Sequence, residues 1–354
     1  MPLNPIAYSV SGQRPPDPDT IAPAFSFIEK MRMLSRVGRF ASMATPSRFM
    51  STIRGTIKVA DGATLAYTRF NPGSAATPLL MINGWTLPQD HWGALMTNGL
   101  YKLPRFGNRE VIIFDNRGVG ESSTTAGPYT VSALAEDAAQ LLESLGHKRA
   151  HLLGMSLGGM IAQQLACDAP EKVASLVLCS TTGGGKLMTA AEKGFARSFF
   201  GCFRSWDDLD NVKQLDAARI FIKGVLAPRN RLSNQSSLVE RMSVSYLWSG
   251  ARNADGINAQ LAALSWKGGL NLGALQQPTL VVHGTHDQVL PFGNGEALAE
   301  AIPNARLVAL DGHGHFWPAT HESAVRTITR FLLDADAGDL AESYSTEPYA
   351  LNYL

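Results

Sequence analysis

Short apolar runs alternate with helix-like segments along most of this chain. The runs share a high content of Val, Ile and Leu at consecutive positions, and they cover residues 78–83, 111–115, 150–153, 174–179, 279–283 and 306–310. Consecutive apolar residues indicate strands that are buried on both faces. Segments with helical periodicity separate most of the runs, for example 131–145, 160–168 and 323–333. The pattern predicts an α/β fold with a mostly parallel, doubly wound sheet.

Two further patterns divide the chain. Residues 56–59 and 64–70 flank Asp61-Gly62 and predict a tight hairpin. Between 183 and 275 the strand series is interrupted by a mostly helical, aromatic-rich segment, which predicts an inserted cap. We therefore expect the α/β core to consist of residues 55–182 and 276–334, with the cap between them.

The two ends of the chain differ from this core. Residues 1–23 are rich in proline and small polar residues, so we expect a flexible segment. Residues 24–54 contain six basic residues and no acid after position 29, which predicts a basic helical arm that packs on the body or on a neighbouring subunit. Residues 335–354 form an acidic tail without clear periodicity. The arm and the tail are the segments through which a homo-oligomer could form.

Composition narrows the class of partner. The 354 residues are 45% hydrophobic and 17% charged, with a formal net charge of +1, so we expect no nucleic-acid partner. No apolar run reaches the length of a membrane span, and the three cysteines have neither disulfide-framework nor metal-ligand spacing. The expected location is the cytoplasm. The basic segment 30–54 keeps two alternatives open, a mitochondrial presequence and a membrane-peripheral helix.

One serine stands where a strand meets a helix. Ser156 follows the apolar run 150–153 and precedes a helix-like segment, and Gly154 and Gly158 flank it in the pattern G-x-S-x-G. Such a sharp turn exposes the serine and needs neighbours without side chains, because strand and helix would otherwise collide. The context predicts a nucleophilic serine.

A serine nucleophile needs a base and an acid that orients the base. Asp287 follows the strand 279–283, and His315 follows the strand 306–310. Both positions lie at the carboxyl ends of predicted strands, where the sites of open α/β sheets collect. Ser156, Asp287 and His315 therefore form the candidate triad. His283, His286 and His313 lie nearby, and we expect them to be structural.

The turn Gly154–Gly158 and four further motifs resemble the α/β-hydrolase fold superfamily over roughly residues 56–333. The four are Asn83-Gly84-Trp85, the D-x-R-G-x-G-x-S turn at 115–122, the acid loop at 283–287 and the histidine loop at 312–315. The resemblance implies that Ser156 is the nucleophile, His315 the base and then acid, and Asp287 the orienting carboxylate.

The resemblance also implies an oxyanion hole. Its donors would be the backbone N–H groups of Leu157 and Trp85. The chain departs from the family pattern here, because Asn83 replaces the usual histidine and Trp85 is bulky. Candidates for substrate contacts are Trp85, Phe199, Phe203 and Trp248. We expect Arg117 to brace its turn rather than to bind substrate.

Serine in place of an aspartate at this turn favours acyl transfer through an acyl-enzyme. The leading hypothesis is hydrolysis of a carboxylic ester or lactone of a small to medium apolar molecule, with no cofactor and no metal. A carbon–carbon bond hydrolase or a thioesterase is an alternative that uses the same triad. A non-hydrolytic ligand-binding member or a cyclase is an alternative of another class.

Overall fold

The computed structural model describes residues 51–92, 109–201, 209–226, 254–317 and 322–339, together with residues 239, 240, 242, 243 and 246. Within these residues the strands form one sheet in the order β1-β2-β4-β3-β5-β6-β7-β8. β1 pairs antiparallel with β2, and β2 pairs antiparallel with β4, whereas all other neighbours are parallel. The predicted α/β fold with a mostly parallel sheet is confirmed.

The strand bounds follow the apolar runs closely. The strands are β1 Thr52–Lys58, β2 Thr64–Phe70, β3 Leu79–Ile82, β4 Val111–Phe114, β5 Ala150–Met155, β6 Val173–Cys179, β7 Thr279–Gly284 and β8 Ala305–Leu310. Every residue of β3, β4, β5 and β7 is buried. These strands need apolar side chains on both faces because helices cover both faces of the sheet.

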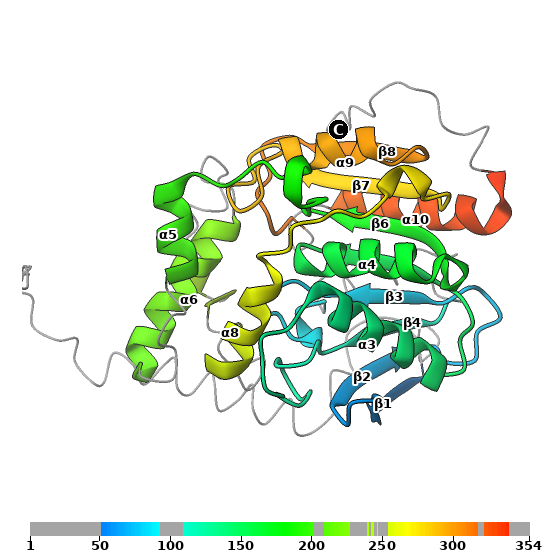
Figure 1. The fold of residues 1–354 in the computed structure, drawn as a ribbon, viewed down its shortest axis with the longest axis horizontal. Coiled ribbons are helices and arrows are strands. Elements are labelled where there is room, and N and C mark those ends of the chain that lie inside the picture. Colours follow the sequence, from blue (N-terminus) through cyan, green and yellow to red (C-terminus); the bar gives the residue numbers. More distant parts are fainter. Residues whose placement is uncertain are drawn as a thin grey trace, which may run out of the picture. The chain divides into compact units, whose positions relative to one another are not determined.

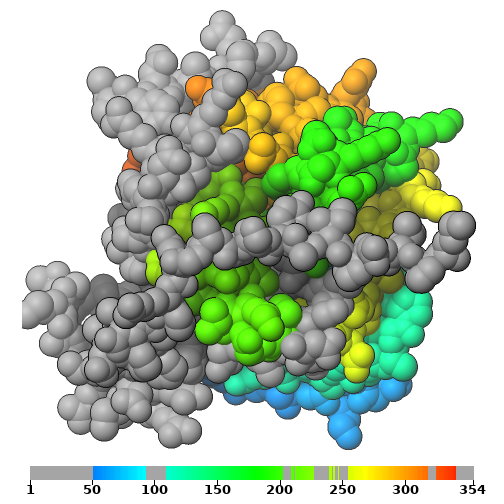
Figure 2. Space-filling model, turned by 90° about the vertical axis from the view of Figure 1, so that its left-hand side faces the viewer, coloured from blue at the N-terminus to red at the C-terminus, as the bar shows by residue number. Residues whose placement is uncertain are grey.

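The helices fall into two groups, those of the core and those of the cap. In the core these are α3 Val131–Ser144, α4 Leu157–Asp168, α9 Gly293–Ala301 and α10 Glu322–Ala337, and in the cap α5 Lys193–Gly201, α6 Asn211–Val225 and α8 Ala254–Ala263. α3 and α4 cover one face of the sheet, and α10 lies behind β6 on the other face (Figure 1). The cap helices gather beyond the carboxyl ends of the parallel strands (Figure 1). Figure 2 looks onto this side, where cap residues in green lie between the orange α9–β8 region and the blue hairpin.

Two predicted boundaries are wrong. Residues 52–54, assigned to the basic arm, belong to β1, because their backbone pairs in register with β2 from Thr52 opposite Phe70. α10 continues to Ala337, beyond the expected end of the core at 334. The expected flexible segment 1–23, residues 24–50 of the arm and residues 340–354 of the tail lie outside the described residues.

The extra turn of α10 is held by an ion-pair cluster at the amino-terminal edge of the sheet. Asp336 accepts hydrogen bonds from Arg109 and from His151 Nε2, the latter at 3.0 Å. His151 Nδ1 lies 2.7 Å from Ser175 Oγ. Burial lowers the pKa of His151. Burial works to raise the pKa of Asp336, but the His151 and Arg109 hydrogen bonds outweigh it and hold this pKa at about 2.

We expect Asp336→Asn to lower the free energy of unfolding at pH 7 by about 1–3 kcal/mol, because it removes the carboxylate that Arg109 and His151 share. The folded-state pKa of Asp336 lies below its unfolded value of 3.8. The carboxylate therefore stabilises the fold above about pH 4, and this contribution is lost as the pH falls towards about 2. Urea unfolding from pH 7 downward should show the difference between variant and wild type shrinking over that window.

Asp216→Asn, on the cap helix α6, is the control for loss of an exposed ion pair. Asp216 pairs with Arg219 three residues later, at 2.8 Å, and its side chain is 61% exposed, so its removal should cost only about 0.5 kcal/mol. Equal losses for the two variants, or a difference that persists unchanged below pH 3, would contradict the role assigned to Asp336.

Candidate active site

Ser156 lies in the turn between β5 and α4, with φ 53° and ψ −119°. A Cβ atom at Gly154 would lie 2.2 Å from the carbonyl oxygen of Gly158, and one at Gly158 would lie 2.0 Å from that of Ile82. The two glycines are therefore required by close backbone contact. The Ser156 N–H donates to the Cys179 carbonyl at 2.9 Å. The backbone thus holds the turn and leaves the hydroxyl for other partners.

Asp287 and His315 meet between the loops after β7 and β8. His315 Nδ1 lies 2.7 Å from Asp287 Oδ2, and both side chains are buried. Asp287 Oδ1 accepts the backbone N–H groups of Val289 and Leu290, each at 2.9 Å. The hydrogen bond to the carboxylate means that Nδ1 carries the proton, so Nε2 is the nitrogen that can accept one.

A second histidine contacts the same carboxylate. His283 Nε2 lies 2.8 Å from the Leu290 carbonyl oxygen and 3.2 Å from Asp287 Oδ2. Burial would raise the pKa of Asp287, but the charge of His315 and the hydrogen bonds from both histidines outweigh it and hold the pKa at about 2. Asp287 is therefore ionised throughout the neutral range. The contact from His283 was missed in the sequence, although the His-x-x-x-Asp spacing could have indicated it.

The other two histidines do not contact Asp287. His313 Nδ1 lies 2.8 Å from the Asp311 carbonyl oxygen, and His286 Nδ1 lies 2.9 Å from Thr285 Oγ1. Both contacts hold the loops together. Of these four histidines, only His283 and His315 therefore contact Asp287, and His315 makes the shorter contact.

The loop after β3 runs beside the serine. A Cβ atom at Gly84 would lie 3.2 Å from Ser156 Cβ, so the backbone here approaches Ser156 closely. Asn83 Nδ2 donates to the Pro88 carbonyl at 2.8 Å, and Asn116 Nδ2 donates to the Asn83 carbonyl at 3.0 Å. The side chain of Asn83 therefore stabilises its own loop. This is the position at which the family motif discussed above has a histidine.

Arg117 braces the turn after β4, as expected. Its guanidinium pairs with Asp137 through two contacts of 2.6 and 2.5 Å and with Asp61 at 2.6 Å. The hydrogen bonds with Asp137 and Asp61 raise the pKa of Arg117 despite its burial. Because Arg117 pairs with Asp61, between β1 and β2, and with Asp137, on α3, it anchors the hairpin and α3 to the turn.

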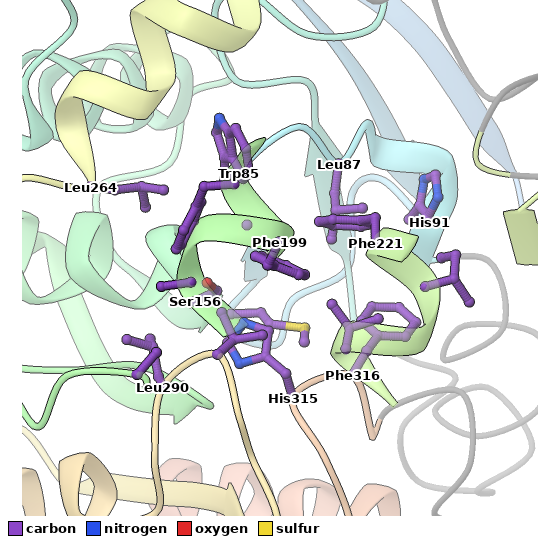
Figure 3. Close-up of a pocket in the computed structure, with 18 of the residues that line it drawn as sticks. Trp85, Leu87, His91, Ser156, Phe199, Phe221, Leu264, Leu290, His315 and Phe316 are labelled. Atoms are coloured by element: carbon purple, nitrogen blue, oxygen red, sulfur yellow. The ribbon is translucent and has the colours of Figure 1, made fainter. Parts of the chain in front are cut away.

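Ser156 and His315 line one cavity of about 360 Å³. Its walls come from the loop after β3, from α4, from the cap and from the loops after β7 and β8 (Figure 3). Most of the lining is apolar, and the residues include Trp85, Leu87, Met155, Met160, Met188, Phe199, Phe200, Phe221, Ile222, Val225, Leu264, Val289, Leu290 and Phe316. Asp90 and His91 also border the cavity. An apolar enclosure strengthens the electrostatic interactions at the serine.

The expected pocket residues have different outcomes. Trp85 and Phe199 line the cavity, and Phe200 adds a ring whose centroid lies 5.5 Å from that of Trp85. Phe203 and Trp248 lie outside the described residues. Phe221, in α6, and Phe316, in the loop after β8, were missed as individual candidates, because a single aromatic residue is more often part of the core than of a pocket.

Two possible features are not found among the described residues. No helix there is long and apolar enough to cross a bilayer. No group of three His, Cys, Asp or Glu side chains in these ranges is arranged to hold a metal ion.

Comparison with known proteins adds three similarities. A family model described as the alpha/beta hydrolase fold matches residues 77–321. A poly(3-hydroxyalkanoate) depolymerase of Ectopseudomonas oleovorans is 33% identical over 228 residues, which cover 64% of this chain and 76% of that protein. A non-heme chloroperoxidase of Streptomyces lividans is 29% identical over 275 residues, which cover 75% of this chain and 95% of that protein.

A solved structure gives the same result in three dimensions. The structure of a hydrolase from Pseudomonas aeruginosa PA01 superposes with a TM-score of 0.63 at 29% identity, covering 79% of this chain and 98% of that one. The region matched by the family model includes Ser156, Asp287 and His315.

Proposed function

The chain belongs to the alpha/beta hydrolase fold family, and from that premise we propose that it is a serine hydrolase that cleaves a carboxylic ester or lactone of a small to medium apolar molecule. The observation that carries the proposal is the buried His315–Asp287 hydrogen bond, with His315 and Ser156 bordering the same apolar cavity. The similarity to a poly(3-hydroxyalkanoate) depolymerase supports an ester as the bond that is cleaved.

The proposed acylation step uses these groups in turn. Ser156 Oγ attacks the carbonyl carbon while its proton passes to His315 Nε2. Asp287 stabilises the imidazolium that forms and keeps its Nδ1 proton directed at the carboxylate. Collapse of the tetrahedral intermediate breaks the bond to the leaving oxygen, which takes the proton from His315. The product left on the enzyme is an acyl ester of Ser156.

Deacylation repeats the same chemistry with water. His315 removes a proton from water, the hydroxide attacks the acyl carbon, and the proton returns to Ser156 Oγ as the carboxylic acid leaves. The oxyanion of each intermediate would be held by the backbone N–H groups of Leu157, at the start of α4, and of Trp85. The amino-terminal end of α4 adds positive potential at this point.

The cavity sets the expected size of the acyl chain. A volume of about 360 Å³ corresponds to on the order of a dozen water-sized groups, at roughly 30 Å³ for each. We expect kcat/KM for p-nitrophenyl esters to rise from acetate to about octanoate, by at most about fourfold for each buried methylene, and to fall for palmitate. Initial rates with a series of acyl lengths measure this.

The outcome also separates the alternative functions. A flat dependence on acyl length would contradict the assignment of this cavity as the acyl site. Turnover of an acyl thioester far above that of the matched oxygen ester would favour a thioesterase. A fluorophosphonate probe that fails to label Ser156 in the folded protein would favour a ligand-binding or cyclase member.

A further inference from the structure

The loop beside Ser156 contains a turn with an unusual residue. The Leu87 N–H donates to the Gly84 carbonyl at 3.3 Å, which closes a four-residue turn over Gly84–Leu87. The third residue of this turn, Thr86, has φ +64°. A positive φ at this position is typical of type II turns and favours glycine or asparagine. A β-branched residue is strained there, so something outside the turn must hold it.

The cap supplies these contacts. The Thr86 N–H donates to Gln260 Oε1 at 3.0 Å, and Thr86 Oγ1 lies 2.6 Å from the hydroxyl of Tyr246. Trp85 Nε1 donates to the Ile257 carbonyl at 3.0 Å. Gln260 and Ile257 belong to α8, and both Gln260 and Tyr246 are fully buried. Three hydrogen bonds therefore join two consecutive loop residues to the cap.

Gln260 uses both ends of its amide. While Oε1 accepts from Thr86, Nε2 donates to the Arg117 carbonyl at 2.9 Å. The Arg117 side chain is itself fixed by Asp137 and Asp61. The amide of Gln260 is thus oriented by a rigid part of the core. With Nε2 held at the Arg117 carbonyl, Oε1 is directed towards the backbone N–H of Thr86.

We propose that Gln260 is a positioning residue that holds the Gly84–Leu87 turn in its strained form and thereby places the N–H of Trp85 beside Ser156. This inference rests on the proposed function, in which that N–H stabilises the oxyanion. Without Gln260, Thr86 relaxes towards negative φ, and the neighbouring backbone moves with it. The cap then determines the competence of the catalytic site as well as the shape of the cavity.

A double-mutant cycle separates positioning from simple support of the fold. Gln260→Met keeps the volume and removes both hydrogen bonds, and Thr86→Gly permits a positive φ without external help. In the chain with Thr86, we expect Gln260→Met to lower kcat for an ester by at least about tenfold with little change in KM, because a donor misplaced by about 1 Å can cost a hundredfold. In the Thr86→Gly chain, the same substitution should lower kcat by less than about threefold.

The matched control is Gln277→Met. Gln277 is also largely buried, and it donates to a backbone carbonyl, that of Pro170, at 3.0 Å. It directly precedes β7 and therefore lies at the amino-terminal ends of the strands, away from Ser156. The substitution should lower the melting temperature without changing kcat. An equal fall of kcat on Gln260→Met in both backgrounds, or no fall in either, would overturn the proposal.

Two further results remain decisive. If Gln260→Met does not fold, Tyr246→Phe tests the same turn through the Thr86 hydroxyl: a severalfold fall in kcat at constant KM supports the proposal, and an unchanged kcat overturns it. If the wild-type protein shows no ester turnover above that of Ser156→Ala, the proposed function itself fails and this inference falls with it. If the wild-type protein turns over the ester but Gln260→Met and Thr86→Gly show no coupling, the inference about Gln260 is rejected and the proposed function stands.

Discussion

Substitution of Ser156 by alanine is expected to lower kcat for ester hydrolysis by on the order of 10⁴-fold or more, because no other group in the proposed mechanism can form the acyl-enzyme. The fold should persist. The contacts of Ser156 that hold the turn use its backbone, namely the N–H to the Cys179 carbonyl and its own carbonyl, which accepts from Thr181 Oγ1 at 2.7 Å. Steady-state kinetics with a p-nitrophenyl ester, together with labelling by a fluorophosphonate, measure the loss.

The chain contains a matched control for this experiment. Ser175, His151 and Asp336 form a second Ser–His–Asp series at the other edge of the sheet, with contacts of 2.7 and 3.0 Å. Ser175 is fully buried and does not border the cavity. Ser175→Ala should therefore lower stability and leave kcat and labelling unchanged. Retention of more than about a tenth of kcat in Ser156→Ala would refute the assignment of the nucleophile.

Asp287→Asn is expected to lower kcat by about 10⁴-fold while the protein remains folded. The amide oxygen of asparagine would keep the two backbone hydrogen bonds from Val289 and Leu290, which now end on Oδ1. Its NH₂ group would then face the Nδ1–H of His315, donor against donor. The imidazole would favour the tautomer with the proton on Nε2, which cannot accept the proton of Ser156.

Asp311→Asn controls for removal of a negative charge near the site. Asp311 is an exposed residue in the loop after β8, and its carboxylate lies 3.3 Å from Thr285 Oγ1. Its substitution should change kcat by less than about twofold. Activity of Asp287→Asn within tenfold of wild type would show that the buried carboxylate does not set the tautomer of His315.

Local sequence patterns were sufficient to predict most of the strands and helices of the core. Consecutive Val, Ile and Leu in 111–115 and 174–179 predicted strands that the structure places at Val111–Phe114 and Val173–Cys179, because burial on both faces excludes polar residues. The glycines around Ser156 were predictable for a similar reason, since the contact of a residue at 158 with Ile82 leaves no space for Cβ. The wrong boundaries, at 52–54 and at 335–337, arose where pairing with distant residues extends an element.

In the candidate site, too, local patterns predicted some features, while others depend on contacts between distant segments. Strand order along the chain predicted that Ser156, Asp287 and His315 lie at the carboxyl ends of the strands, and the resemblance to the family motifs favoured His315 over the neighbouring histidines. The contact of His283 with Asp287 depends on the bend of the loop after β7, and the lining by Phe221 depends on how α6 packs. Neither feature follows from the periodicity of apolar residues, which indicates that a side chain is buried but not which residues it contacts.

By itself, the sequence determined the α/β alternation, the glycine-flanked turn at Ser156, and the placement of Asp287 and His315 directly after strands, because each of these depends on local backbone geometry and on residues close in the chain. Only the tertiary structure decided which cap residues hold the Gly84–Leu87 turn, and how large the cavity is. Gln260 contacts Thr86 across 174 positions of sequence. No local pattern encodes such a contact, because it arises from the packing of two elements whose relative placement the whole core imposes.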